Sequence, residues 1–281
     1  MTGTGRGPLL TAESHALMAR ALAQGATQCA CSLDLGLSVS EVGVTAAGFT
    51  WGDCAYPWPA ALKDRTIYYW DGRDFAPASV YSGSLIKLVP TQWGAPTFEI
   101  DGIKMLPTAR ESSFEDARRK VELVGVRRRC VLDTCGGLGY FAAWCLRLGA
   151  ARVLSCEKNS QVLWLRELNP WSPGPDPALE LRTVAIESHI QSLPDASFEV
   201  VLHDPPRMGI AGELYSREFY LQLARVLKPG GTLFHYTGSP NKLTSGRDVP
   251  EEVLRRLQQS GFQARRALDG VLARSVLKPV R

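Results

Sequence analysis

The 281-residue chain lacks several features that would each indicate a particular class of protein. No apolar run approaches the roughly 18 residues that a membrane-spanning helix needs. The chain does not open with the basic and then apolar segments of a secretory signal peptide, and Glu13 argues against an acid-poor transit peptide. We therefore expect a cytoplasmic protein that does not act at a membrane.

The chain also lacks a strong excess of one charge. It has 32 basic and 28 acidic side chains and a net charge of +4, which does not by itself indicate a nucleic-acid partner. The runs Arg118-Arg119-Lys120 and Arg127-Arg128-Arg129 could form a basic face. We favour the simpler interpretation, in which they are the solvated flanks of a helix and of a strand.

The seven cysteines do not have the spacing of metal ligands. Cys29 and Cys31 are one residue too close for a zinc knuckle, and Cys130, Cys135 and Cys156 lie in or beside apolar runs, where cysteine acts as a small hydrophobe. We expect no metal site and a reducing compartment.

The pattern of predicted helices and strands changes near residue 107. Residues 1–107 contain one probable helix, at about 12–24 with Thr11 as its N-cap, followed by short strand-like runs broken by Gly, Pro and Asp. Asp101-Gly102 stands between alternating residues and predicts a two-residue hairpin turn. We predict a small, mainly β N-terminal domain over 1–107 and a second domain over 108–281.

The second part alternates strands with helices of about 10 to 15 residues, a pattern that predicts a mostly parallel, Rossmann-like α/β sheet covered on both faces. The predicted strands cover residues 130–137, 151–159, 181–190, 197–206 and 232–238, with a closing hairpin over 264–278. The predicted helices cover residues 114–125, 140–150, 160–171, 217–231 and 250–262. Ligands bind outside the carboxyl ends of the strands in such sheets.

A glycine-rich turn follows the first of these strands. Gly137, Gly139 and Ala142 have the spacing G-x-G-x-x-A, which lets a backbone turn tightly and approach a ligand at a helix N-terminus. Asp133 ends the strand before the turn, where a carboxylate repels a phosphate and attracts a cation. Glu157 ends the next strand, where an acid can accept both hydroxyls of a ribose. S-adenosyl-L-methionine has the ribose and the cationic tail and lacks the phosphate.

The sequence Asp133-Thr-Cys-Gly-Gly-Leu-Gly139 resembles the first motif of class I S-adenosylmethionine-dependent methyltransferases, with Cys135 in place of the first glycine. Together with TFEIDGIKM, LNPWS, HDPPR, GELYSREFY, RVLKPGG and HYTG, it resembles a group of predicted methyltransferases best represented in archaea, over residues 85–281. The resemblance implies the class I methyltransferase fold and the cofactor. The cofactor-binding candidates are Asp133, Cys135, Gly137, Gly139, Glu157, Lys158, Glu187 and Asp204. Among them Glu187 departs from the usual Gly-Asp pair that binds the adenine amino group.

Asp204-Pro205-Pro206-Arg207 follows the fourth predicted strand and resembles the Asp/Asn-Pro-Pro-aromatic motif of methyltransferases that act on amino or amide nitrogen. The prolines fix φ and remove two donors, so the carboxylate and the prolyl carbonyls can hold an NH2 group as acceptors. These four residues are the catalytic candidates. Arg207 replaces the ring that would stack on a base, and it suits an anionic substrate group or an internal partner such as Glu213.

Other side chains near this rim are candidates for substrate contact. Tyr215 could replace the missing ring or simply pack at the start of the next helix, and Tyr236 is preferred over His235 as the side chain that faces the pocket. Strand alternation makes His203 a core histidine. Ser112, Ser113 and Glu115 could contact the cofactor, but an N-capped helix with Ser113 and Asp116 as a capping box is the preferred interpretation.

The sequence favours a methyltransferase acting on nitrogen in a small molecule, an RNA or a protein. The first alternative is an aminopropyltransferase of the polyamine-synthase kind, which would need several acids around the substrate. The loop after the fourth strand offers only Glu213 besides Asp204. The second alternative is a non-catalytic nucleoside- or RNA-binding module that uses the aromatic residues of the N-terminal region.

Overall fold

The structure, a computed structural model, describes residues 7–238 and 248–276. Contacts divide the chain into two compact units, each treated by itself below. The first contains the chain up to Glu115 together with Trp164–Ser172, and the second contains Asp116–Leu163 and the chain from Pro173 onward. Whether residues 1–107 fold as a separate domain stays a prediction.

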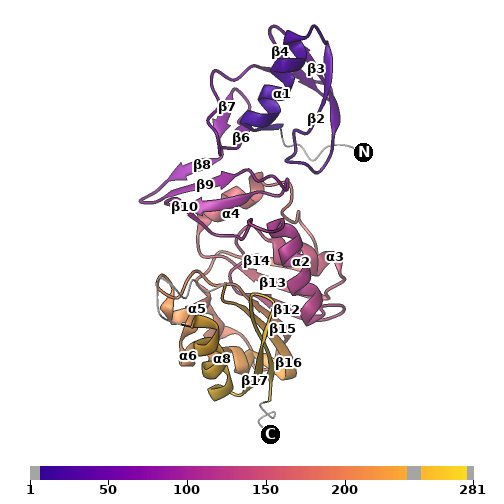
Figure 1. The fold of residues 1–281 in the computed structure, drawn as a ribbon. Helices are drawn as coiled ribbons and strands as arrows, with labels where there is room; N and C mark the ends of the chain where they lie inside the picture. Colours follow the sequence, from indigo (N-terminus) through magenta and orange to yellow (C-terminus); the bar gives the residue numbers. More distant parts are fainter. Residues whose placement is uncertain (1–6, 239–247, 277–281) are drawn as a thin grey trace. The chain divides into compact units, whose positions relative to one another are not determined.

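The first unit is mainly antiparallel β-structure, as the sequence predicts. Helix α1 (Ala12–Ala23) begins with Thr11 as its N-cap, whose hydroxyl accepts from the Ser14 backbone N–H. The described strands form sheets in the orders β1-β6-β7, β2-β3-β4-β5 and β11-β10-β9-β8 (Figure 1). They are β1 (Leu9–Leu10), β2 (Gln28–Cys31), β3 (Ser40–Thr45), β4 (Gly48–Trp51), β5 (Cys54–Pro57), β6 (Tyr68–Trp70), β7 (Phe75–Pro77), β8 (Ser79–Tyr81), β9 (Leu85–Val89), β10 (Thr97–Ile100) and β11 (Ile103–Lys104).

The aromatic residues of this unit build its core. Phe49, Tyr56 and Phe75 lie ring against ring with centroids 5.4–6.3 Å apart, which is aromatic packing of the ordinary kind. The predicted hairpin at Asp101-Gly102 is confirmed. Both residues have positive φ, and Ile100 pairs with Ile103 across the turn.

The second unit is built on a seven-stranded sheet in the order β14-β13-β12-β15-β16-β18-β17. Its first five strands are parallel neighbours, and β18 is antiparallel to both β16 and β17, so the predicted closing hairpin is confirmed. The strands are β12 (Cys130–Asp133), β13 (Arg152–Cys156), β14 (Leu179–Arg182), β15 (Phe198–His203), β16 (Leu227–Tyr236), β17 (Phe262–Ala267) and β18 (Gly270–Ser275).

Helices connect these strands and bury the apolar side chains of the sheet. They are α2 (Ser113–Val124), α3 (Tyr140–Arg147), α4 (Ser160–Leu168), α5 (Ile186–His189), α6 (Arg217–Val226) and α8 (Val249–Gln259), with the 3-10 turns η1 (Ile190–Ser192) and η2 (Gly212–Tyr215). One core cluster joins Val201 and Leu233 of the sheet to Tyr220 of α6 and Leu257 of α8. The two ends of α2 and of α4 belong to different units.

Two predicted elements are partly wrong. The helix expected over residues 217–231 ends at Val226, and residues 227–231 begin β16. The third strand was expected over residues 181–190, but β14 ends at Arg182, and Ile186–His189 form a helical turn. The apolar residues Ile186 and Ile190 stand four apart and are both buried, which fits a helical turn as well as a strand, so the short run was ambiguous in sequence.

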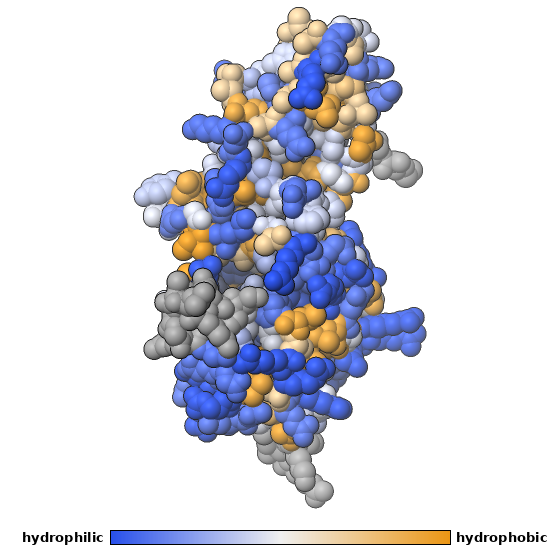
Figure 2. Space-filling view, in the orientation of Figure 1, coloured by the Kyte–Doolittle hydropathy of each residue, from blue (hydrophilic) through white to orange (hydrophobic). Residues whose placement is uncertain are grey.

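In Figure 2, hydrophilic side chains cover most of the visible face of the second unit, and hydrophobic ones form only small groups. Within residues 7–238 and 248–276, no helix is both long and apolar enough to cross a membrane.

Candidate functional site

The order of the strands reverses between β12 and β15. From β12 the chain continues outward to β13 and β14, and from β15 it continues in the other direction to β16. Such a switch point leaves a crevice at the carboxyl ends of the two central strands, where α/β sheets bind ligands. Asp133 ends β12 and Asp204 follows β15, so the sequence-predicted acids lie at this reversal.

The glycine-rich turn after β12 is fixed to both neighbouring strands. Thr134 N donates to Leu202 O at 3.0 Å, and Gly136 N donates to Cys156 O at 2.7 Å. Gly137 and Gly139 have φ values of +49° and +81°, a region where a side chain brings strain. Gly139 is also the N-cap of α3. The turn therefore presents the N-terminus of α3 at the end of the sheet, with no side chain on either glycine.

Two carboxylates lie at this turn in different environments. Asp133 is fully buried, and its Oδ2 accepts from Ser155 Oγ at 2.8 Å. Glu157 is half-buried. Its Oε2 accepts from the backbone N–H of Gly137, 20 residues earlier in the chain, at 3.0 Å, and its Oε1 accepts from the nearby Asn159 N at 2.9 Å. The structure thus brings Glu157 to the glycine turn, and its predicted contact with a ribose stays a prediction.

The other cofactor-binding candidates differ in exposure. Cys135 is half-buried in the turn, and burial together with the nearby charge of Glu157 raises the pKa of its thiol. Lys158 is exposed. Glu187 was expected just past a strand and lies instead in the short helix α5, half-buried.

Asp204 is half-buried directly beyond β15, and Pro205 is buried behind it. Removal of the Asp204 carboxyl from water raises its pKa to about 7. The charge of Lys120 lowers this pKa, whereas the charges of Asp116, Asp269 and Asp133 raise it further. Asp204 therefore lies among three other acids and one base, and it can exchange a proton near neutral pH.

Tyr215 folds back over the Asp-Pro-Pro segment. Its ring is buried in η2, and its hydroxyl donates to Pro206 O at 3.1 Å. One of the two prolyl carbonyls expected to hold a substrate therefore already accepts a hydrogen bond from the protein. Pro206 O keeps one lone pair, whereas among the described residues no hydrogen bond of Tyr215 is made to the Asp204 carboxylate or Pro205 O, which we take as the main acceptors of the segment.

Arg207, the fourth catalytic candidate, is exposed. The alternative of an ion pair with Glu213 is not found in the described part of the chain, where Glu213 is exposed as well. Arg207 therefore stays a candidate for contact with an anionic group.

A pair of buried histidines braces the segment. His203 Nδ1 lies 2.7 Å from Thr134 Oγ1 and Nε2 lies 3.0 Å from Leu214 O, and its ring centroid is 4.4 Å from that of His235. Burial lowers the pKa of His203 to about 4 and that of His235 well below its usual value. Both rings are therefore neutral at pH 7. His203 is a structural residue that ties the glycine turn to η2, as strand alternation predicted.

The sequence did not identify Lys120 as part of the site, and its assignment to a solvated helix flank is wrong. The Lys120 side chain is 1% exposed. Its Nζ lies 2.6 Å from Asp116 Oδ2 on the same helix and 3.2 Å from Asp269 Oδ2 in the turn between β17 and β18. The face of the Tyr236 ring is 4.1 Å away, so Tyr236 does point inward. The i,i+4 spacing of Asp116 and Lys120 is the sequence signal that could have indicated this ion pair. Asp116 was instead expected to form a capping box with Ser113.

Among the described residues, no group of three or more His, Cys, Asp or Glu side chains is arranged to hold a metal ion.

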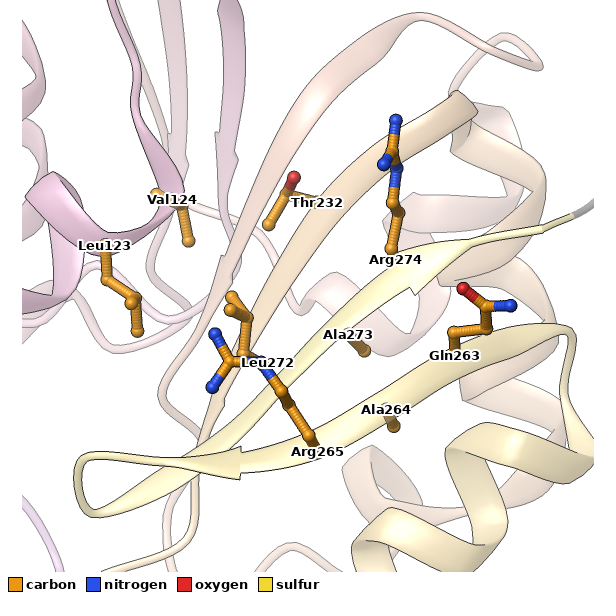
Figure 3. A pocket seen from close by; sticks show the side chains of 9 residues that line it. All are labelled: Leu123, Val124, Thr232, Gln263, Ala264, Arg265, Leu272, Ala273 and Arg274. Carbon is orange, nitrogen blue, oxygen red and sulfur yellow. The ribbon is translucent and has the colours of Figure 1, made fainter.

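The pocket in Figure 3 lies on a face of β16, β18 and β17 beside the end of α2, and its walls include Leu123, Thr232, Arg265 and Arg274. None of the predicted site residues lines it.

The sheet order β14-β13-β12-β15-β16-β18-β17 is that of a Rossmann-like fold of the class I methyltransferase type. No protein-family model matches the chain. The uncharacterized protein MJ1233 of Methanocaldococcus jannaschii is 40% identical over 222 residues, which cover 78% of this chain and 76% of that protein. The chain therefore belongs to the same family as MJ1233.

Solved structures extend the likeness of the fold. A spermidine synthase in complex with the transition state analogue AdoDATO matches with a TM-score of 0.56 and 20% identity, over 70% of this chain and 72% of that one. The spermidine synthase of Thermotoga maritima matches with a TM-score of 0.54 and 18% identity, over 70% and 71% of the two chains. At these identities the likeness concerns the fold.

Proposed function

We propose that the chain is an S-adenosylmethionine-dependent transferase that methylates an amino or amide nitrogen. The observation that carries this proposal is the meeting of three features at the switch point. They are a glycine turn without side chains, Glu157 hydrogen-bonded to that turn, and Asp204-Pro205 at the end of the adjacent strand.

The groups around the glycine turn fit the cofactor. Glu157 offers a half-buried carboxylate to the ribose hydroxyls, and the N-terminus of α3 opens beside it. Asp133 is fully buried, so its carboxylate can act on a positive charge only through space. The side chain of Lys158, next to Glu157, is exposed to solvent. S-adenosylmethionine supplies an electrophilic methyl group when it is bound. Asp133, Cys135, Gly137, Gly139 and Glu157 would hold it, with Lys158 and Glu187 at the periphery.

Asp204 and Pro205 supply the acceptor side of the reaction. An N–H of the substrate can donate to the Asp204 carboxylate and to Pro205 O, which orients the nitrogen lone pair away from both. As the nitrogen gains a methyl group it loses a proton, and Asp204 can accept this proton because its pKa is raised to about 7. Tyr215 keeps the segment in place through Pro206 O.

Calorimetry with S-adenosylmethionine, followed by labelled-methyl transfer into fractionated cell extract, tests the proposal. We expect binding, and label in one of the RNA, protein or small-molecule fractions. Asp204→Ala should abolish transfer and leave cofactor affinity nearly unchanged. Normal turnover in that variant would refute the role of Asp204. If Arg207 binds an anionic substrate group, Arg207→Ala should raise KM.

Aminopropyl transfer is the second candidate, because the fold is shared with spermidine synthases and because Asp116 and Asp269 add acids around Asp204. The sequence had offered only Glu213 for such a role. Calorimetry with decarboxylated S-adenosylmethionine separates the candidates. A clear preference for the decarboxylated form would favour aminopropyl transfer over methylation.

A further inference from the structure

Lys120 holds a fully buried positive charge at the proposed acceptor site. Its ammonium contacts Asp116 and Asp269 as ion pairs and the face of Tyr236 as a cation–π partner. A buried charge is costly unless it is paired, so these three contacts together explain how α2 can carry a lysine whose side chain is 1% exposed.

The three contacts come from separate parts of the second unit. Asp116 lies one turn before Lys120 on α2, Asp269 lies in the turn between β17 and β18, and Tyr236 ends β16. Asp269 is itself held in place, because Thr237 N donates to its backbone carbonyl at 3.3 Å. The position of the ammonium is therefore defined by the fold as a whole.

Two carboxylates and an aromatic face are also what a primary ammonium ion from solution would need. A diamine bound there would place one ammonium between Asp116, Asp269 and Tyr236 and extend toward Asp204. His203 pairs with His235 on the adjacent parallel strands, so Asp204 follows β15 at the level where Tyr236 ends β16. In this protein the position is already filled from within, by the end of a lysine side chain.

We propose that Lys120 determines the acceptor specificity of the site: its ammonium fills the cation position beside Asp204 and so excludes diamine and polyamine acceptors. The inference rests on the proposed function, and it separates the two candidate reactions. A site whose cation position is filled suits a nitrogen that arrives uncharged, as an amide or an aromatic amine does.

The test measures binding of 1,4-diaminobutane to the full chain by calorimetry and by thermal shift. Lys120→Ala removes the ammonium and its stem, and we expect it to bind the diamine at least about tenfold more tightly than the wild type, a difference of about 1.4 kcal/mol. Lys120→Arg keeps a cation in the same place and should not gain diamine affinity. Butanol, which has the same length without the charge, should not bind to either variant.

Lys120→Ala leaves acids without their counter-ion and could prevent folding. The double variant Lys120→Ala/Asp116→Asn removes one of these charges, and it should still bind the diamine more tightly than the wild type does. Equal diamine affinity in wild type and folded variant would overturn the proposal, as would tight binding by the wild type.

Calorimetry with S-adenosylmethionine on the same samples distinguishes this failure from failure of the proposed function. A wild type that binds no S-adenosylmethionine contradicts the proposed function. A wild type that binds S-adenosylmethionine, combined with a Lys120→Ala variant that does not gain diamine affinity, contradicts only the role of Lys120.

Discussion

The raised pKa of Asp204 predicts a stability that depends on pH in an unusual direction. The carboxyl has a pKa of about 7 in the folded chain, against an ordinary value of 3.8. Between these two values the folded chain holds a proton that the unfolded chain has lost. The free energy of unfolding therefore falls as pH rises through this range, by about 1.4 kcal/mol per pH unit for this one group.

The substitution Asp204→Asn removes this pH-dependent contribution to the free energy of unfolding. The difference of 3.2 between the two pKa values corresponds to at most about 4 kcal/mol, reached above pH 7, and the partial exposure of the side chain reduces it. Relative to wild type, the variant should gain stability steadily from pH 5 to pH 7 and then level off. Near pH 4 the two proteins should differ only by the change of side chain.

Urea unfolding of both proteins at pH 5, 6, 7 and 8 measures this difference. Glu213→Gln is the matched control, since it removes an exposed carboxyl from the same loop. Its effect on stability should stay constant over that range. A constant difference between wild type and Asp204→Asn would refute the reasoning, because the folded and unfolded chains would then titrate alike at this position.

Three further predictions concern the turn and the loop. Glu157→Ala should weaken S-adenosylmethionine binding at least about tenfold in calorimetry, because the acid at the glycine turn is lost; unchanged affinity would contradict the ribose assignment. Gly139→Ala and Gly149→Ala both place a side chain at positive φ and should each cost about 1 kcal/mol in urea unfolding. Only Gly139→Ala should also reduce cofactor affinity, and equal affinities would argue against the turn as the cofactor site. Tyr215→Phe should lose about 1 kcal/mol of stability with the hydrogen bond to Pro206 and should lower kcat more than cofactor affinity, so unaltered kcat would exclude a positioning role.

Local sequence patterns determined the hairpin at Asp101-Gly102, the start of α1 and the parallel sheet of the second unit. Asp101-Gly102 predicts its hairpin because both residues must adopt positive φ, and Thr11 predicts the start of α1 because a hydroxyl can accept a backbone N–H there. The alternation of strands and helices likewise predicts the parallel sheet. It also places Asp204 at a strand end, since each strand must finish at the same edge.

The position of Glu157 at the end of the next strand predicts that it lies at the same edge of the sheet as the glycine turn, and its role as a ribose ligand stays a prediction. Adjacent parallel strands bring the ends of β12 and β13 together, and Glu157 then accepts from Gly137 N. The end of the third strand was predicted less well. Buried Ile186 and Ile190 suit either a strand or a helical turn, and a short apolar run does not distinguish the two.

Only the tertiary structure decided the environment of Lys120. In the sequence it stands beside Arg118 and Arg119 and has the composition of a solvated helix face. Its partner Asp269 lies 149 positions further along the chain, and the pairing of β16 with β18 places Asp269 beside Tyr236, whose ring lies over the Lys120 ammonium. Burial and long-range charge pairing are properties of the assembled sheet. The sequence therefore determined that the glycine turn, Glu157 and Asp204 stand at strand ends, and the fold decided which charges surround Asp204.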